Sequence, residues 1–228
     1  MYYNVNIVRR SNAMRTARFQ KAVTPSRPHG SHRFDVFGPK IGRRLTLFGR
    51  EALQLWLRME ADPQVVTYCE RPMRISGRSR AADFWVETNV GEQLYLIARL
   101  PPGPSAGQGA CPCPCPCPAL EAWGLARSIA LRVISPDDLN DSEMLCQNRL
   151  TMLQYVAARP LATVAESRTT ILSACESGLS LAVLERQFEQ IDPAVVRTTA
   201  FSLILQDRLA CPTIASQPLG PRSQLVKR

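Results

Sequence analysis

The sequence has no long uninterrupted apolar run, and this absence excludes one class of protein. No run approaches the roughly 18 residues that a membrane-spanning helix needs. The opening residues, 1–10, also lack the apolar stretch and the small-residue cleavage site of a secretory leader. We therefore expect a cytoplasmic protein with no membrane partner.

The eight cysteines do not have the spacing of a disulfide framework. Four of them alternate with prolines in a low-complexity segment, residues 101–118, where a polyproline rod would hold successive thiols about 6 Å apart and facing different ways. Zinc needs four thiolates at about 2.3 Å around one ion, so we expect a surface loop without zinc. The remaining four lie among apolar neighbours, as reduced core cysteines do: Cys69, Cys146, Cys175 and Cys211.

Acidic residues are scarce in the first fifty positions. This segment holds eleven Lys and Arg residues and one acid, Asp35, which gives +10 against −1 for the rest of the chain and +9 in total. A basic arm over residues 1–40 indicates a polyanionic partner, most simply DNA. The alternative is a solvated basic tail. A membrane surface is disfavoured because Pro25, Pro28 and Gly30 interrupt any amphipathic helix there.

Apolar periodicity divides the rest of the chain into short elements. Positions from Leu45 to Met59 form one helical stripe, which Asp62 and Pro63 end. Apolar or alternating runs separated by turn signals then predict strands and hairpin-like connections. The expected strands are 65–75, 84–86, 94–100 and 130–135, and the expected helices are 120–128 and 142–158. Pro160 ends the last of these helices and marks a domain boundary.

Residues 161–228 have a different organisation, with three short helices and a strand-like tail. Ser180 is a suitable N-cap for a helix over 181–188. Asp192 and Pro193 begin another, over 193–206. This order predicts an all-α, winged helix-turn-helix-like domain whose recognition helix exposes Arg197, Thr198 and Thr199. Docking to DNA and docking to a protein partner stay equally open, because one arginine supplies few contacts to a DNA groove.

Two carboxylates in the first domain have the placement of a metal-dependent nuclease site. Glu51 lies on an amphipathic helix, and Asp83 opens a strand. A nuclease uses a divalent ion to acidify the attacking water, and Mg²⁺ takes oxygen ligands in octahedral geometry. A third ligand and a lysine two residues apart on the next strand would share one face. Those positions hold Ile97, which cannot ligate, and Arg99, which stays protonated.

The ordered set of motifs resembles the TnsA family, the endonuclease subunit of heteromeric bacterial transposases. The resemblance covers residues 41–156, about half of the chain. It is carried by a Gly-Arg run into the Glu51 helix, by an Asp-Pro-x-Val segment, by a Glu-x-Pro strand, by an Ala-Asp-Phe strand, and by the later A-W-G-L and V-I-S-P-D-D-L segments. These lie at 49–51, 62–65, 70–72, 82–84, 122–125 and 133–139.

The resemblance implies an α/β restriction-endonuclease-like core over residues 41–160, with a mixed sheet flanked by helices. It implies catalytic roles for Glu51, Asp83 and Arg99, and Mg²⁺ or Mn²⁺ held by the two carboxylates. The implied partners are DNA, a DDE-type transposase that acts on the 3′ ends while this subunit cuts the 5′ ends, and a regulatory AAA+ ATPase. The arginines that we expect to contact DNA are Arg43, Arg44, Arg50 and Arg197.

The isoleucine at position 97 leaves a second hypothesis open beside that of an active endonuclease. With two carboxylates from a fuller set, the chain could instead be a catalytically degenerate scaffold that bridges transposase, ATPase and DNA. A transcription regulator with a vestigial nuclease fold is a third hypothesis, and the nearly neutral helix-turn-helix region disfavours it.

Overall fold

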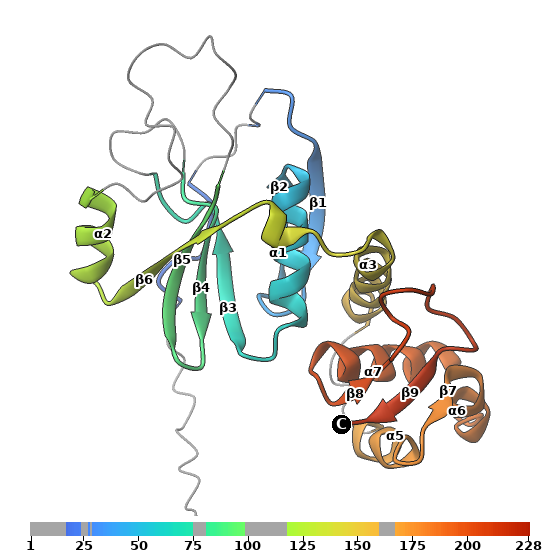
Figure 1. Ribbon diagram of the computed structural model, residues 1–228. Helices are drawn as coiled ribbons and strands as arrows, with labels where there is room; N and C mark the ends of the chain where they lie inside the picture. The colour runs from blue at the N-terminus through green and yellow to red at the C-terminus, as the bar shows by residue number, and fades with distance from the viewer. Residues whose placement is uncertain (1–16, 24–26, 28, 75–80, 99–117, 160–166) are drawn as a thin grey trace, which may run out of the picture.

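A four-stranded mixed sheet forms the centre of the first half of the chain (Figure 1). The computed structural model describes residues 17–23, 27, 29–74, 81–98, 118–159 and 167–228. The strand order is β3-β4-β5-β6; the first three strands are antiparallel, and β6 runs parallel to β5. Their bounds are Val65–Glu70, Phe84–Thr88, Gly91–Ile97 and Ile129–Ile134. The expected mixed sheet is confirmed.

Helices cover both faces of this sheet, because alternate strand residues send apolar side chains to opposite sides. Helix α1, Arg50–Ala61, packs on one face through a large core, and α2, Pro118–Leu125, packs on the other through a smaller one. The face beneath α1 includes Phe84, Val86, Tyr95 and Ile97. The face beneath α2 includes Cys69, Trp85, Leu94 and Leu96.

A β-hairpin precedes α1, and here two sequence expectations are wrong. Strand β1, Arg33–Gly38, falls within the segment expected to be an irregular arm, and β2, Arg43–Phe48, takes the place of the first third of the expected helix. The helix begins only at Arg50 because Gly49, with φ of 91°, breaks the chain direction. Leu45 and Phe48 matched the helical stripe because apolar strand positions can coincide with a helical period over a few residues.

The last third of the chain is built around helix α7, Pro193–Leu205. The other helices are α3 (Glu143–Ala157), α5 (Arg168–Ala174) and α6 (Leu181–Gln187), and a short 3₁₀ turn, η1 (Asp137–Leu139), precedes α3. A small antiparallel sheet has the order β7-β9-β8, with bounds Leu179–Ser180 for β7, Gln224–Lys227 for β9 and Leu209–Ala210 for β8. The expected caps are confirmed: Ser180 accepts the N–H of Val183, and Asp192 that of Ala194. The sheet makes the expectation of an all-α region wrong.

Helix α7 is the centre of this region and not an exposed recognition helix. Thr198 and Thr199 are fully buried, and their hydroxyls donate to the carbonyls of Ala194 and Val195. The expectation that both threonines are exposed is therefore wrong. The physical reason is that α7 packs against α3, α5 and α6 together, so that little of its surface is left for solvent.

Apolar packing and hydrogen bonds join the two parts of the chain. The core beneath α1 continues through Met152 and Leu153 of α3 into Phe201 of α7. Buried Asn148 of α3 donates to the carbonyls of Ile214 and Gln217, both at 2.7 Å, and accepts the N–H of Leu219 at 2.9 Å. These three bonds fix the 213–219 segment against α3.

Two further expectations concern the cysteines and the membrane. Cys69, Cys175 and Cys211 are buried free thiols, as expected, and Cys146 is half-buried. The Cys-Pro run and the absence of zinc that we expect there fall on residues 99–117, outside the part that the structure describes. Within the described ranges, none of the helices has the length and apolar character needed to span a membrane.

Candidate functional site

One end of the mixed sheet brings together the positions that the sequence singled out. Strands β3 and β5 end there, β4 begins there, and α1 begins at the same end (Figure 1). The pairing register fixes this arrangement, since Glu70 lies opposite Phe84, which lies opposite Tyr95. Glu51, Asp83 and Ile97 therefore belong to one end of the fold.

Glu51 lies in the first turn of α1 and is exposed. Gly49, two residues before it, is the N-cap, and a Cβ on this glycine would come within 3.0 Å of Oε2 of Glu51. The carboxylate therefore lies back over the helix N-terminus, where the helix dipole favours negative charge. The positive φ of position 49, 91°, favours glycine there.

Asp83 lies just before β4 and is joined to the neighbouring strands by hydrogen bonds. Its N–H donates to the carbonyl of Tyr95 at 3.1 Å, and its carbonyl accepts the N–H of Arg71 at 2.8 Å. Its Oδ2 accepts the N–H of Ile97 at 2.7 Å. The half-buried carboxylate is thus held at the end of β5 by a backbone group.

The position expected to supply a third ligand is occupied by a core side chain. Ile97 is 4% exposed and belongs to the apolar core beneath α1. Arg99, expected as the catalytic cation, lies outside the described residues, which end on this side at Ala98. Within the described ranges, no three His, Cys, Asp or Glu side chains gather into a group that could hold a metal ion.

The two carboxylates fit a magnesium ion in their chemistry, although they do not form a full ligand set. Magnesium normally takes one or two carboxylates from a protein and completes its octahedron with water and substrate phosphates. Glu51 and Asp83 supply two oxygen ligands, and the apolar Ile97 supplies no side-chain ligand. That the two carboxylates share an ion stays a prediction.

The arginines expected to contact DNA divide into two kinds. Arg43 holds Glu70 in a two-pronged ion pair, at 3.0 and 2.6 Å, and this pairing raises the pKa of Arg43. Arg197 is paired with Glu185 and also donates to the hydroxyl of Tyr155. These two guanidinium groups already form ion pairs within the folded protein.

Arg44 and Arg50, in contrast, are exposed at the surface. Arg44 lies on β2, and Arg50 is the first residue of α1. Exposed cations of this kind can reach a phosphate without breaking an internal ion pair. Of the four arginines expected at DNA, these two are the better placed.

Arg71 is a residue that the sequence did not single out. It follows Glu70 with φ of 42°, a left-handed conformation that is costly for a side chain larger than glycine. Both of its backbone groups are bonded, to Asp83 and to Val23, and its guanidinium lies 4.9 Å from the ring centre of Phe48. Its place inside the Glu-x-Pro segment was the one available signal.

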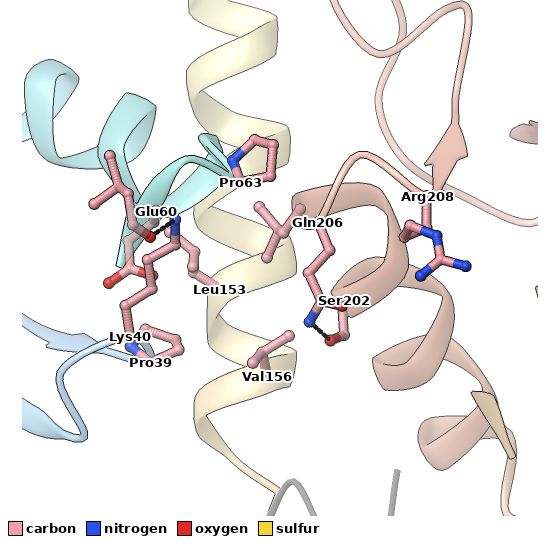
Figure 2. A pocket seen from close by; sticks show the side chains of 11 residues that line it. Pro39, Lys40, Glu60, Pro63, Leu153, Val156, Ser202, Gln206 and Arg208 are labelled. Carbon is pink, nitrogen blue, oxygen red and sulfur yellow. Dashed lines mark hydrogen bonds between the residues drawn. The ribbon is translucent and has the colours of Figure 1, made fainter. Parts of the chain in front are cut away.

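A hollow between the two parts of the chain contains a buried acid. Its volume is about 420 Å³. Figure 2 shows Lys40 and Glu60 on one side and Ser202 and Gln206 on the other, with α3 between them. Glu60 is 2% exposed, so that its charge is largely removed from water.

A chain of hydrogen bonds leads into this hollow from the core. The indole N–H of Trp56 donates to the hydroxyl of Tyr68 at 2.7 Å, and that hydroxyl donates to Oε1 of Glu60 at 2.5 Å. Burial raises the pKa of Glu60 to about 7, and the bond from Tyr68 and the charge of Lys40 only partly offset this. Glycine is required at position 38, since a Cβ there would lie 2.3 Å from the Tyr68 hydroxyl.

Comparisons with known proteins do not assign the chain. It matches no protein-family model and no curated protein. Its function is therefore inferred from the geometry of the site and from the order of the motifs.

Proposed function

We propose that the chain is a TnsA-like endonuclease subunit of a heteromeric transposase. It would cut the 5′ ends of a transposon, beside a DDE-type transposase and under the control of an AAA+ ATPase, in the cytoplasm. One observation supports this above the others. The elements α1, β4 and β5 bring Glu51, Asp83 and Ile97 to one end of a mixed sheet. Those are the positions at which the family it resembles carries its catalytic groups.

In this proposal Glu51 and Asp83 hold Mg²⁺ or Mn²⁺. The ion, when bound, acidifies the attacking water and neutralises charge on the leaving phosphate oxygen. The protein's own residues orient the two ligands. The N–H of Ile97 fixes Oδ2 of Asp83, and the N-terminus of α1 stabilises the charge of Glu51.

The last region has the element order of a winged helix-turn-helix domain: α5, β7, α6, α7, β8 and β9. Its helix α7 would be the recognition helix, but α3 packs against it and Arg197 is ion-paired. A helix covered in this way cannot enter a DNA groove without separating from α3. The packing therefore favours docking to a protein partner, for which the AAA+ ATPase is our proposal.

A strand-specific cleavage assay tests the function. The chain is combined with a DDE-type transposase and an AAA+ ATPase, the proposed partners, and with DNA carrying the transposon end, and 5′-strand cuts are measured with and without Mg²⁺. We expect Glu51→Gln and Asp83→Asn each to reduce cutting by about 10²–10³-fold. Glu121→Gln, on an exposed position of α2, is the matched control and should cut normally. Cutting that is unchanged in both site variants contradicts the assigned residues.

A second candidate function is a scaffold that binds DNA and partners without cutting. The buried side chain of Ile97 at the third ligand position favours it. In that case the reconstituted complex still assembles, the two site variants assemble equally well, and no metal-dependent 5′ cut appears. Assembly and cutting measured in parallel therefore separate the two candidates.

A further inference from the structure

A polar cavity of about 590 Å³ lies over the β1–β2 hairpin and the end of β3. Its walls carry three guanidinium groups, two carboxylates and a threonine hydroxyl. The lining residues are Ala22, Arg33, Asp35, Arg44, Leu45, Thr46, Glu70 and Arg71. Neither the expected catalytic set nor the interdomain hollow uses this cavity.

The two carboxylates of the cavity are each paired with an arginine. Asp35 accepts the hydroxyl of Thr46 at 2.7 Å and the guanidinium of Arg33 at 3.0 to 3.2 Å, and these bonds lower its pKa. Glu70 is held at both oxygens by Arg43. Asp35 is thus paired with Arg33 of the cavity wall, and Glu70 with Arg43 beside it.

The other two arginines, Arg44 and Arg71, come from different elements. Arg44 is exposed on β2. Arg71 lies at the end of β3, where its strained backbone, its bond to the carbonyl of Thr46 at 2.6 Å and the ring of Phe48 fix its side chain. Strain of this kind persists where the surroundings hold a residue in place, and it concentrates at ligand-binding sites.

Arg71 also links the cavity to the candidate catalytic end of the fold. Its backbone N–H donates to the carbonyl of Asp83, whose carboxylate lies at the end of β5. The cavity therefore borders the Asp83 end of the sheet. Guanidinium groups suit the binding of an anionic chain because their planar donors match phosphate oxygens.

We infer that this cavity is a binding site for the phosphodiester backbone of DNA, contacted by Arg44 and Arg71, next to the Asp83 end of the sheet. The inference rests on the proposed DNA-directed function, but it does not require that the chain cut. The hydroxyl of Thr46 and the guanidinium of Arg33 hold Asp35 in place, and Arg33 offsets part of its charge. The site recognises backbone and not sequence.

Binding of a short duplex of arbitrary sequence, measured over a series of salt concentrations in EDTA, tests the inference. Each phosphate contact contributes about 0.9 to the slope of log affinity against log salt. We expect Arg44→Gln to lower the slope by about that amount and Arg44→Lys to retain it. Arg186→Gln removes an exposed arginine from α6 and should leave the slope unchanged.

Two outcomes overturn the inference. One is a slope for Arg44→Gln equal to that of Arg186→Gln. The other is an unchanged slope on DNA together with weaker binding of polyglutamate, which would identify an acidic polypeptide as the ligand. Arg71→Lys, checked for folding by thermal denaturation, should weaken duplex binding while the melting midpoint is retained.

The result is independent of cleavage because EDTA removes the metal. A lower slope in Arg44→Gln without Mg²⁺-dependent cutting in the reconstituted complex leaves this site standing and rejects the active endonuclease. Cutting that depends on Asp83, with an unchanged slope in Arg44→Gln, supports the active endonuclease and rejects the cavity as a DNA-binding site.

Discussion

The carboxylate of Asp83 accepts the backbone N–H of Ile97 at 2.7 Å, so that the residue in the third ligand position holds one of the two remaining candidate ligands. Any residue at position 97 except proline can donate this bond, because it uses the main chain. The side chain at 97 can therefore change while Asp83 keeps its place. A side chain that can bind a metal ion can therefore be introduced at position 97 without losing the hydrogen bond to Asp83.

Replacing Ile97 by Gln together with Arg99→Lys should raise Mg²⁺-dependent cutting of the 5′ strand. The amide adds an oxygen ligand, and a positioned group of this kind typically contributes about 10²–10³ in rate. Cutting is measured in the reconstituted complex, with Arg99→Lys alone as the control. Because Ile97 is buried in the core, its replacement also lowers stability, and the fraction folded is measured beside the rate. Cutting by a folded double variant at the wild-type rate would contradict the assignment of position 97.

Glu60 should make the stability of the protein fall as pH rises toward neutrality. Its pKa is about 7 in the folded chain against 4.5 as the ordinary value, so between these values the folded state binds more protons than the unfolded state. The stabilisation is complete below pH 4.5 and is lost as pH rises through 7. Taking 1.36 kcal/mol per pKa unit, the full effect is about 3 kcal/mol.

Urea denaturation across this pH range measures the effect. Glu60→Gln keeps an acceptor for the Tyr68 hydroxyl and should flatten the pH dependence, with the largest gain in stability above pH 7. Glu189→Gln, at an exposed position, serves as the control and should retain the wild-type profile. A Glu60→Gln profile that still falls with the wild-type slope would assign the proton to another group.

Asn148→Ala should destabilise the protein by about 1–3 kcal/mol. The change leaves two carbonyls and one N–H of the 214–219 segment without their partner, and because these bonds are only partly buried, water replaces some of them. The exposed neighbour Gln147, changed to Ala, is the control. Chemical denaturation gives the loss, and faster amide exchange confined to residues 213–219 locates it. Equal effects of the two substitutions would show that the three hydrogen bonds of Asn148 contribute little to stability.

Removing residues 1–16 should reduce the salt dependence of DNA binding. This segment contains Arg9, Arg10 and Arg15, and the log–log slope falls by about 0.9 for each phosphate that is no longer bound. The deletion stops at residue 16 because Ala17 and Phe19 pack on the core beneath α2. A full-length variant with the three arginines changed to Gln should match the deletion. A slope that neither change lowers would show that the arm does not touch DNA.

Local patterns in the sequence were sufficient where neighbouring residues decide the structure. The caps at Ser180 and Asp192 and the three antiparallel strands of the mixed sheet are of this kind. The hairpin strands were missed because their alternation is short: Phe37 is apolar at an exposed position, and Leu47 and Phe48 are adjacent and both buried.

The remaining errors have causes that lie far apart in the sequence. Thr198 and Thr199 are polar, and the packing of α3, α5 and α6 against α7 decides that they are buried. The bond from Ile97 to Asp83 uses a backbone N–H, which no side-chain motif records. The left-handed backbone of Arg71 likewise follows from its two long-range hydrogen bonds.

The hydrogen bonds of Asn148 limit where two related genes can recombine and still encode a protein that folds. A crossover near codon 160 would deliver residues 161–228 without Asn148 and without Ser142, whose hydroxyl donates to the carbonyl of Ala215 at 2.8 Å. The incoming segment would meet an α3 shaped for another partner. A crossover upstream of codon 142 would carry α3 along with the segment that it holds. Inheritance of residues 161–228 as a working block should therefore include α3, so that chimaeras joined before residue 142 fold and those joined at residue 160 do not.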